Sequence, residues 1–345
     1  MSRWMTVSGC CVAAALFLAG CVTTSENTAT SPPSVTPASE AAVRSTLDKA
    51  SMPRQLKDLI IRLHHADPVE RAWAAYQLAK LGRGAAPAVP YLLNLLEDET
   101  PVLLTRYIGA GFRSSSDTTP ADEAVRTLAQ IGDPATTPLV LALKHPLPGV
   151  RARAAKALGQ IGDLNTIEFL LGALHDNDRR VRASAAIALG NYRHPRAVQV
   201  IMDAWFAETD PAIQADMIYA LAQINDIIAV PFLIEQSDTT DVNLRAAIVF
   251  AMGKLGDARA VPALLAHLDD ADDVVRTNAA YALGKYYNPQ VIDALIARLT
   301  DPVEQVRTAV EESLGLLTGM QLGREQASWQ QWWAATRATM QTGTY

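Results

Sequence analysis

One helix ending recurs along the chain at a nearly constant interval. It reads TLAQIGD at 127–133, KALGQIGD at 156–163 and ALGNYRH at 188–194. Alignment on the apolar residue before the turn gives eight positions: Leu78, Leu128, Leu158, Leu189, Leu221, Met252, Leu283 and Leu314. Their spacings are 50, 30, 31, 32, 31, 31 and 31 residues, so one period runs through eight copies with a single insertion. Self-similarity at a fixed period of this length predicts a solenoid of stacked units.

Each copy contains two helical patterns. In one copy these are VPALLAHL (261–268) and VVRTNAAYALGKY (274–286), with Asp, Pro or Gly between the helices. The turn after the second helix, such as Gly256-Asp257, supplies a helix stop and then an N-cap for the next helix. The pattern therefore predicts an all-α chain of helix pairs.

These 31-residue helix pairs, with D-x-x-V-R-like entries and L-G-x-x-G-D-like exits, resemble HEAT repeats. They are most similar to the short subtype named after the phycobilisome lyases, and the resemblance covers roughly residues 54–319. It implies a right-handed α-solenoid of about eight HEAT-like helix pairs with a C-terminal capping helix. Since such folds serve mostly as scaffolds for binding, the resemblance indicates the fold more strongly than the function.

Arginine dominates the position seven residues before each aligned residue. On a helix this position lies only about 20° from the aligned residue, at the packed seam. Aspartates lie nearby in sequence at Asp67, Asp178, Asp210, Asp241 and Asp272. We expect a structural Arg-to-Asp ladder that joins successive repeats through Arg71, Arg151, Arg182, Arg245, Arg276 and Arg307.

The first 21 residues contain all three cysteines of the chain. Arg3 gives a positive start, and the apolar core at 10–19 is too short to span a bilayer. The sequence Leu18-Ala19-Gly20-Cys21 closely resembles a bacterial lipoprotein signal, in which the peptide is cleaved before a cysteine that then carries the lipid. The resemblance implies lipidation of Cys21. The alternative is an ordinary signal peptide in which this cysteine is incidental.

The residues after Cys21 bear on location and domain organisation. In the Gram-negative lipoprotein family an Asp after the cysteine commonly retains the protein at the inner membrane, and Val22 stands there instead. The resemblance thus implies an exported, lipid-anchored protein, at the outer membrane facing the periplasm if the host is Gram-negative. Residues 22–40 are dominated by Ser, Thr and Pro and predict a tether without fixed structure. We expect a signal peptide at 1–20, lipidated Cys and tether at 21–50, solenoid at 51–319 and a Trp-rich cap and tail at 320–345.

The chain departs from the repeat at two places. Residues 101–119 are inserted before the second helix of repeat two, and either a loop on a binding face or a disordered excursion would fit. Near the C-terminus, Trp329, Trp332 and Trp333 fall on one helical face. A solenoid needs a cap over its last apolar surface, so we expect this helix to be the cap, with an exposed recognition patch as the alternative.

Composition and motifs give little support for an enzyme or a nucleic-acid-binding protein. The net charge is −6, and no basic tract appears. HEAT-repeat hydroxylases bind two irons through repeated His-Glu pairs, but none of the six histidines here is followed by Glu. No phosphate loop, nucleotide fingerprint, nucleophile elbow or zinc spacing occurs. We therefore predict no catalytic residue, metal or cofactor and no nucleic-acid partner.

The exposed face of the second helices offers the candidate binding residues. Relative to the aligned residue, positions −5, −2 and +2 lie opposite the packed seam. Four consecutive repeats carry apolar residues at position −2: Ile187, Tyr219, Phe250 and Tyr281. Position +2 carries amides, which could bind an extended backbone, and then lysines, which could meet acids: Gln160, Asn191, Gln223, Lys254 and Lys285. Curvature could instead crowd the aromatic rings together as ordinary inner-wall packing.

These observations predict a membrane-anchored envelope scaffold or adaptor. It would bind a protein or peptide partner along the concave face of the solenoid. The alternative is a lyase-like or accessory enzyme that holds a small cofactor or substrate in the same groove.

Overall fold

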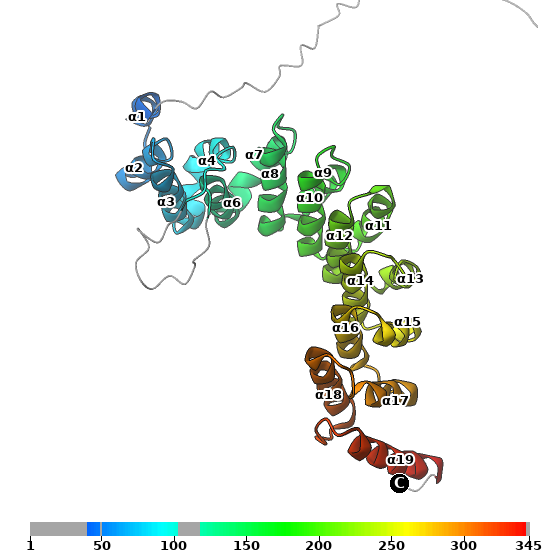
Figure 1. The fold of residues 1–345 in the computed structure, drawn as a ribbon. Helices are drawn as coiled ribbons and strands as arrows, with labels where there is room; N and C mark the ends of the chain where they lie inside the picture. Colours follow the sequence, from blue (N-terminus) through cyan, green and yellow to red (C-terminus); the bar gives the residue numbers. More distant parts are fainter. Residues whose placement is uncertain (1–39, 49, 103–117, 343–345) are drawn as a thin grey trace, which may run out of the picture. The chain divides into compact units, whose positions relative to one another are not determined.

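The computed structural model describes residues 40–48, 50–102 and 118–342 (Figure 1). The expected lipidation site Cys21, most of the expected tether and residues 103–117 of the insertion lie outside the described residues. Within these ranges the named elements are all helices, and Val102 forms one isolated antiparallel bridge with Thr118. The prediction of an all-α fold is confirmed.

The helices follow the predicted pairs. The first four pairs are α2 (Arg54–Arg62) with α3 (Pro68–Ala79); η1 (Gly82–Ala88) and α4 (Val89–Leu95) with α6 (Pro120–Ile131); α7 (Asp133–Ala142) with α8 (Pro148–Ile161); and η2 (Leu164–Thr166) and α9 (Ile167–Ala173) with α10 (Arg179–Tyr192). The last four are α11 (Arg196–Ala207) with α12 (Pro211–Ile224); η3 (Ile227–Ala229) and α13 (Val230–Glu235) with α14 (Val242–Leu255); η4 (Ala258–Ala260), α15 (Val261–Ala266) and η5 (His267–Asp269) with α16 (Asp273–Leu283); and α17 (Pro289–Arg298) with α18 (Glu304–Thr318). Helices α1 (Glu40–Asp48) and α19 (Gln326–Thr342) flank them.

The second helices of the pairs form one continuous series. Each packs against the next, in the order α3, α6, α8, α10, α12, α14, α16 and α18 (Figure 1). All eight aligned residues, from Leu78 to Leu314, are completely buried. Each repeat therefore places an apolar residue at the same position in a shared core, as in a solenoid.

Neighbouring second helices approach closely at the residue after the aligned one. An ideal Cβ built on Gly253 would lie 2.5 Å from Cβ of Ala282, and one on Gly159 would lie 2.5 Å from Cβ of Ala188. Only a residue without a side chain fits at such a separation. The glycine of the repeated L-G dipeptide is thus a packing requirement between repeats.

The five aspartates expected to pair with arginines are helix N-caps instead. Asp67, for example, accepts a hydrogen bond from the N–H of Val69 at 2.9 Å. The others begin α10, α12, α14 and α16 in the same way: Asp178, Asp210, Asp241 and Asp272. The expected partners were therefore wrong, because an aspartate that precedes a helix is taken up by the free N–H groups of its first turn.

The arginines bind acids that lie 25–27 residues later, in the turn of the next repeat. The donor–acceptor distances range from 2.5 to 2.9 Å for Arg71–Asp98, Arg151–Asp176, Arg182–Glu208, Arg245–Asp270 and Arg276–Asp301. Each arginine also donates to two carbonyl oxygens of its own turn, as Arg276 does to Asp270 and Ala271. Arg307, in the last pair, bonds to the carbonyls of Asp301 and Pro302 and to the carboxylate of Glu304. The ladder joins successive repeats, but through different acids.

The two ends of the series are covered by helices. Residues 40–48 belong to the expected tether, yet they form α1, which packs on α2 and buries Val43 and Leu47. The tether boundary at residue 50 was therefore placed too late. At the other end α19 packs on α17, and Trp329 and Trp333 are only 1% and 4% exposed. Both tryptophans belong to the shared core, as a cap requires.

Candidate functional site: the face of the second helices

The four apolar residues at position −2 form an exposed row on consecutive second helices. Ile187 lies on α10, Tyr219 on α12, Phe250 on α14 and Tyr281 on α16, and their exposed fractions are 47%, 44%, 42% and 45%. The rings of Tyr219 and Phe250 are in contact, with centroids 5.8 Å apart and planes inclined by 59°. The rings touch without being covered, so about half of each side chain remains accessible to a partner. We call these four residues the apolar row.

Amide side chains at position +2 run beside the apolar row. Gln160, Asn191 and Gln223 are exposed, and their amides make no hydrogen bond to another residue in the part of the chain that the structure describes. Each amide offers a donor and an acceptor. The structure thus places three unoccupied amides along one side of the row.

The two lysines expected to meet acids differ from each other. Lys254 is exposed and forms no ion pair with a described residue. The ammonium group of Lys285 instead donates a hydrogen bond to the backbone carbonyl of Gly253 on the preceding second helix. Lys285 is therefore partly engaged in joining two repeats, and Lys254 is the better placed of the two to bind a partner.

Position −5 is less exposed than the helix geometry predicts, because it faces the neighbouring second helices. Ala247 and Ala309 are fully buried there, and Glu123 is almost so. At this position α12 carries Asp216, which is half-buried and makes no hydrogen bond or ion pair with another described residue. Burial, reinforced by the nearby Asp210, raises the pKa of Asp216 above its usual value. The sequence could have indicated this residue, because it lies five positions before the aligned residue of its repeat.

Beyond the apolar row, position −2 carries charged or partly covered residues. The guanidinium of Arg126 lies 2.5 Å from the carboxylate of Glu123, and the ammonium of Lys156 lies 4.0 Å from Asp122. At the first repeat Lys80 stacks over the ring of Tyr76, 4.4 Å from its centroid. At position −2, exposed apolar residues therefore occur on α10, α12, α14 and α16, and on none of the other described second helices.

A group of three aromatic residues on the first helices, one of them exposed, was not expected from the sequence. Trp205, Phe206 and Phe232 form a cluster of edge-to-face rings with centroids 5.2–5.6 Å apart. Phe206 is 62% exposed, and the buried indole nitrogen of Trp205 has no hydrogen-bond partner among the described residues. The consecutive aromatics at 205–206 are the only signal for it in the sequence.

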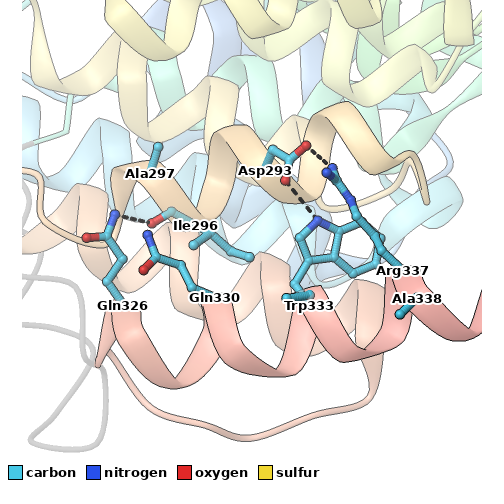
Figure 2. Close-up of a pocket in the computed structure, with 9 residues that line it drawn as sticks. Asp293, Ile296, Ala297, Gln326, Gln330, Trp333, Arg337 and Ala338 are labelled. Carbon is cyan, nitrogen blue, oxygen red and sulfur yellow. Dashed lines mark hydrogen bonds and ion pairs between the residues drawn. The ribbon is translucent and has the colours of Figure 1, made fainter.

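A cavity of about 460 Å³ lies between α17 and α19 (Figure 2). Its polar groups are mostly bonded to one another. Trp333 donates its indole N–H to Asp293 at 2.8 Å, Arg337 pairs with the same carboxylate, and Gln326 donates to the carbonyl of Ile296 at 3.0 Å. These contacts join the cap to the last repeat, so the cavity is a seam of the fold rather than a prepared ligand site.

The described residues contain neither a candidate metal-binding cluster nor a candidate membrane-spanning helix. No group of three or more His, Cys, Asp and Glu side chains is arranged there to hold a metal ion. No helix in those ranges is long and apolar enough to cross a bilayer.

Comparison with known proteins agrees with the repeated helix pairs seen in the structure. The model of HEAT repeats matches residues 105–190, 167–242 and 230–315, and that of the PBS lyase HEAT-like repeat matches residues 70–98. The chain is 29% identical over 182 residues to the bilin biosynthesis protein PecF of Nostoc sp., covering 48% of this chain and 94% of that protein. It is 35% identical over 124 residues to the deoxyhypusine hydroxylase of Eremothecium gossypii, covering 30% of this chain but only 38% of the hydroxylase.

Solved structures resemble the chain in fold. The karyopherin Kap121p, bound to the extreme C-terminus of the phosphatase Cdc14p, gives a TM-score of 0.58 at 13% identity over 81% of this chain and 34% of that one. Importin beta gives 0.57 at 14% identity over 85% and 45%. The matched family models span residues whose helix pairs, buried leucines and glycine contacts repeat with the same period, and the chain therefore belongs to the HEAT-repeat family.

Proposed function

We propose that this protein binds a protein or peptide partner along the face of its second helices, as a scaffold or accessory subunit. The observation that carries the proposal is the apolar row. Four consecutive repeats leave 42–47% of an Ile, Phe or Tyr side chain accessible, and unoccupied amides lie alongside. A contiguous apolar strip with polar borders is typical of an interaction site.

The chemistry of the row suits an extended segment. Aromatic side chains bury much apolar area with few rotatable bonds, so they contribute strongly when a partner covers them. Amides at position +2 would exchange hydrogen bonds with the partner's backbone. Because the second helices are held by the core and the ladder, little conformational entropy is lost on binding.

A cross-linked pull-down from intact cells, analysed by mass spectrometry, tests the proposal. Wild type is compared with a variant carrying Tyr219→Ser, Phe250→Ser and Tyr281→Ser. A control variant carries Leu141→Ser, Phe206→Ser and Ile228→Ser, which remove three apolar residues that are more exposed than those of the row, from the first helices and η3. All three proteins must show equal abundance and helical content.

A protein recovered with wild type and with the control, but lost with the first variant, supports the proposal. Recovery of the same proteins with all three would contradict it. Loss with the control alone would assign binding to the exposed apolar residues of the first helices and η3 instead.

A second candidate is a lyase-like or accessory role in which the same face holds a small cofactor. The similarity to the bilin biosynthesis protein favours it, because the match extends over 94% of that relative. Visible absorbance of the purified protein, lost with the substitution of Tyr219, Phe250 and Tyr281, would support this role over peptide binding.

We also propose that the protein is exported and anchored through a lipid on Cys21, at the outer membrane in a Gram-negative host. Support comes from the sequence motif around Cys21 alone. The test is detergent phase partitioning of wild type and Cys21→Ser, with mass spectrometry of the mature N-terminus. Equal partitioning of both into the aqueous phase would reject the anchor.

A further inference from the structure

Asp216 is a carboxylate without a partner at the centre of the candidate face. It lies three residues before Tyr219 on α12, so the two side chains occupy the same side of the helix. It makes no hydrogen bond or ion pair with any residue in the ranges that the structure describes. Tyr219 in turn contacts the ring of Phe250 on α14.

In repeat two the acid at the equivalent position has a cationic partner, which Asp216 lacks. There Glu123 is followed three residues later by Arg126, and the guanidinium lies 2.5 Å from the carboxylate. In repeat five the residue three positions later is Tyr219, which has a ring in place of a cation. In repeat two a buried acid is thus neutralised within its own helix, whereas in repeat five a half-buried acid has no cation among the described residues.

The neighbouring second helices do not supply the cation. The residues that correspond to Asp216 on α10 and α14 are Ser184 and Ala247, whose side chains are short and uncharged. Asp210, at the start of α12, carries the same charge as Asp216. Half-burial of an unpaired charge is costly, because water is partly excluded and no opposite charge replaces it.

The protein places arginines between an aromatic ring and a carboxylate at two other sites. Arg62 lies 5.1 Å from the ring centroid of Trp73 and 2.9 Å from Glu70. Arg337 lies 4.9 Å from the ring centroid of Trp333 and pairs with Asp293 (Figure 2). A guanidinium is stabilised in such a position by both the ring face and the acid.

We propose that Asp216, with the rings of Tyr219 and Phe250, receives a basic side chain of the partner, so that the bound segment carries an Arg or Lys among apolar residues. This inference rests on the proposed function, since it assigns the chemistry of the segment that covers the apolar row. The basic head group bonds to the carboxylate while its stem lies against the rings.

A library of random peptides displayed on phage tests the inference with a defined probe. Selection is performed on wild type, on Asp216→Asn, on the Tyr219→Ser, Phe250→Ser, Tyr281→Ser variant, and on Asp238→Asn. Asp216→Asn keeps the shape and removes the charge. Asp238 is an exposed acid outside the face that also has no partner among the described residues, so its variant controls for net charge.

Wild type and Asp238→Asn are expected to enrich peptides with Arg or Lys flanked by apolar residues. Asp216→Asn is expected to retain the apolar preference and lose the basic one. A selected arginine peptide and its citrulline analogue are then synthesised. The neutral citrulline should weaken binding to wild type by about 10- to 100-fold, as for loss of a hydrogen bond between charged groups, and should not weaken binding to Asp216→Asn.

The results that would reject the proposed function differ from those that would reject only the role of Asp216. If wild type enriches no peptide over the triple serine variant, the proposed function is rejected together with this inference. If peptides are enriched without a basic preference, or if the preference persists with Asp216→Asn, only the role of Asp216 is rejected.

Discussion

Replacing Arg276 by alanine should uncouple the last repeats from the rest of the solenoid. Its guanidinium donates to both carboxylate oxygens of Asp301, at 2.9 and 3.2 Å, and the two side chains are only 10% and 1% exposed. It also donates to two carbonyl oxygens of its own turn. Removal of one partner from a buried ion pair costs about 3–5 kcal/mol, because the remaining charge stays desolvated.

The lower part of that range applies here. Asp301 keeps the hydrogen bond from the N–H of Val303 at 2.9 Å, and a guanidinium nitrogen of Arg298 lies 4.0 Å away. We therefore expect a loss of about 3 kcal/mol in the free energy of unfolding of the C-terminal repeats. A matched control is Arg83→Ala, since Arg83 and its partner Asp133 are both 74% exposed and such a pair contributes less than about 1 kcal/mol.

Urea unfolding followed by circular dichroism gives the free energy, and amide hydrogen exchange locates the loss. Because each repeat contacts only its neighbours, protection should fall in α17, α18 and α19 while α8 and α10 keep theirs. The double variant Arg276→Ala, Asp301→Ala should recover part of the stability, since it leaves no unpaired charge. Equal effects of Arg276→Ala and Arg83→Ala, or a loss of protection spread over all repeats, would refute the argument.

Two further predictions concern packing and acid stability. Gly253→Ala should destabilise by about 1–3 kcal/mol in thermal unfolding, because its Cβ would lie 2.5 Å from that of Ala282, whereas Gly172→Ala meets nothing within 4 Å and should be neutral or stabilising. The hydrogen bond from Arg151, with help from the backbone, holds the pKa of Asp176 below its usual value. This carboxylate therefore stabilises the fold fully above its unfolded pKa of about 3.9, and its contribution is lost as the pH falls through the folded value. Urea midpoints measured from pH 7 to pH 3 should fall at the acid end, and less steeply for Asp176→Asn; identical profiles for the two proteins would contradict the assignment.

Most of the fold follows from periodicity, because each repeat must bury the same face against the next. The aligned leucines, the glycine beside them and the arginine seven residues earlier all lie at the seams between second helices. The repeat period alone therefore locates these residues, without knowledge of any contact between residues far apart in the sequence. The end helices are harder, since each occurs once. The cap was predicted from Trp329, Trp332 and Trp333, whereas α1 was missed because its nine residues bury only Val43 and Leu47.

The partners of the arginines could not be derived from proximity in sequence. Asp272 lies four residues before Arg276, but its carboxylate binds the N–H groups of Val274 and Val275. The acid that Arg276 does bind is Asp301, 25 residues later, and only the stacking of repeats brings the two together. Such a pairing can be predicted once the sequence separation between an arginine and the acid of the next repeat is known.

The apolar row lies at a position where the fold does not require an apolar residue. Position −2 is exposed in the repeats that carry Arg126, Lys156 and Glu312, and these charged residues do not prevent their helices from packing. The solenoid therefore does not require an apolar residue at this position. The residues of the shared core lie on the opposite side of the same helices and include none of the four residues of the apolar row, so the row can be replaced by serine without removing a core contact. Four consecutive apolar residues at a position where the fold accepts charge, with an unpaired acid beside them, are best explained by a partner that covers them.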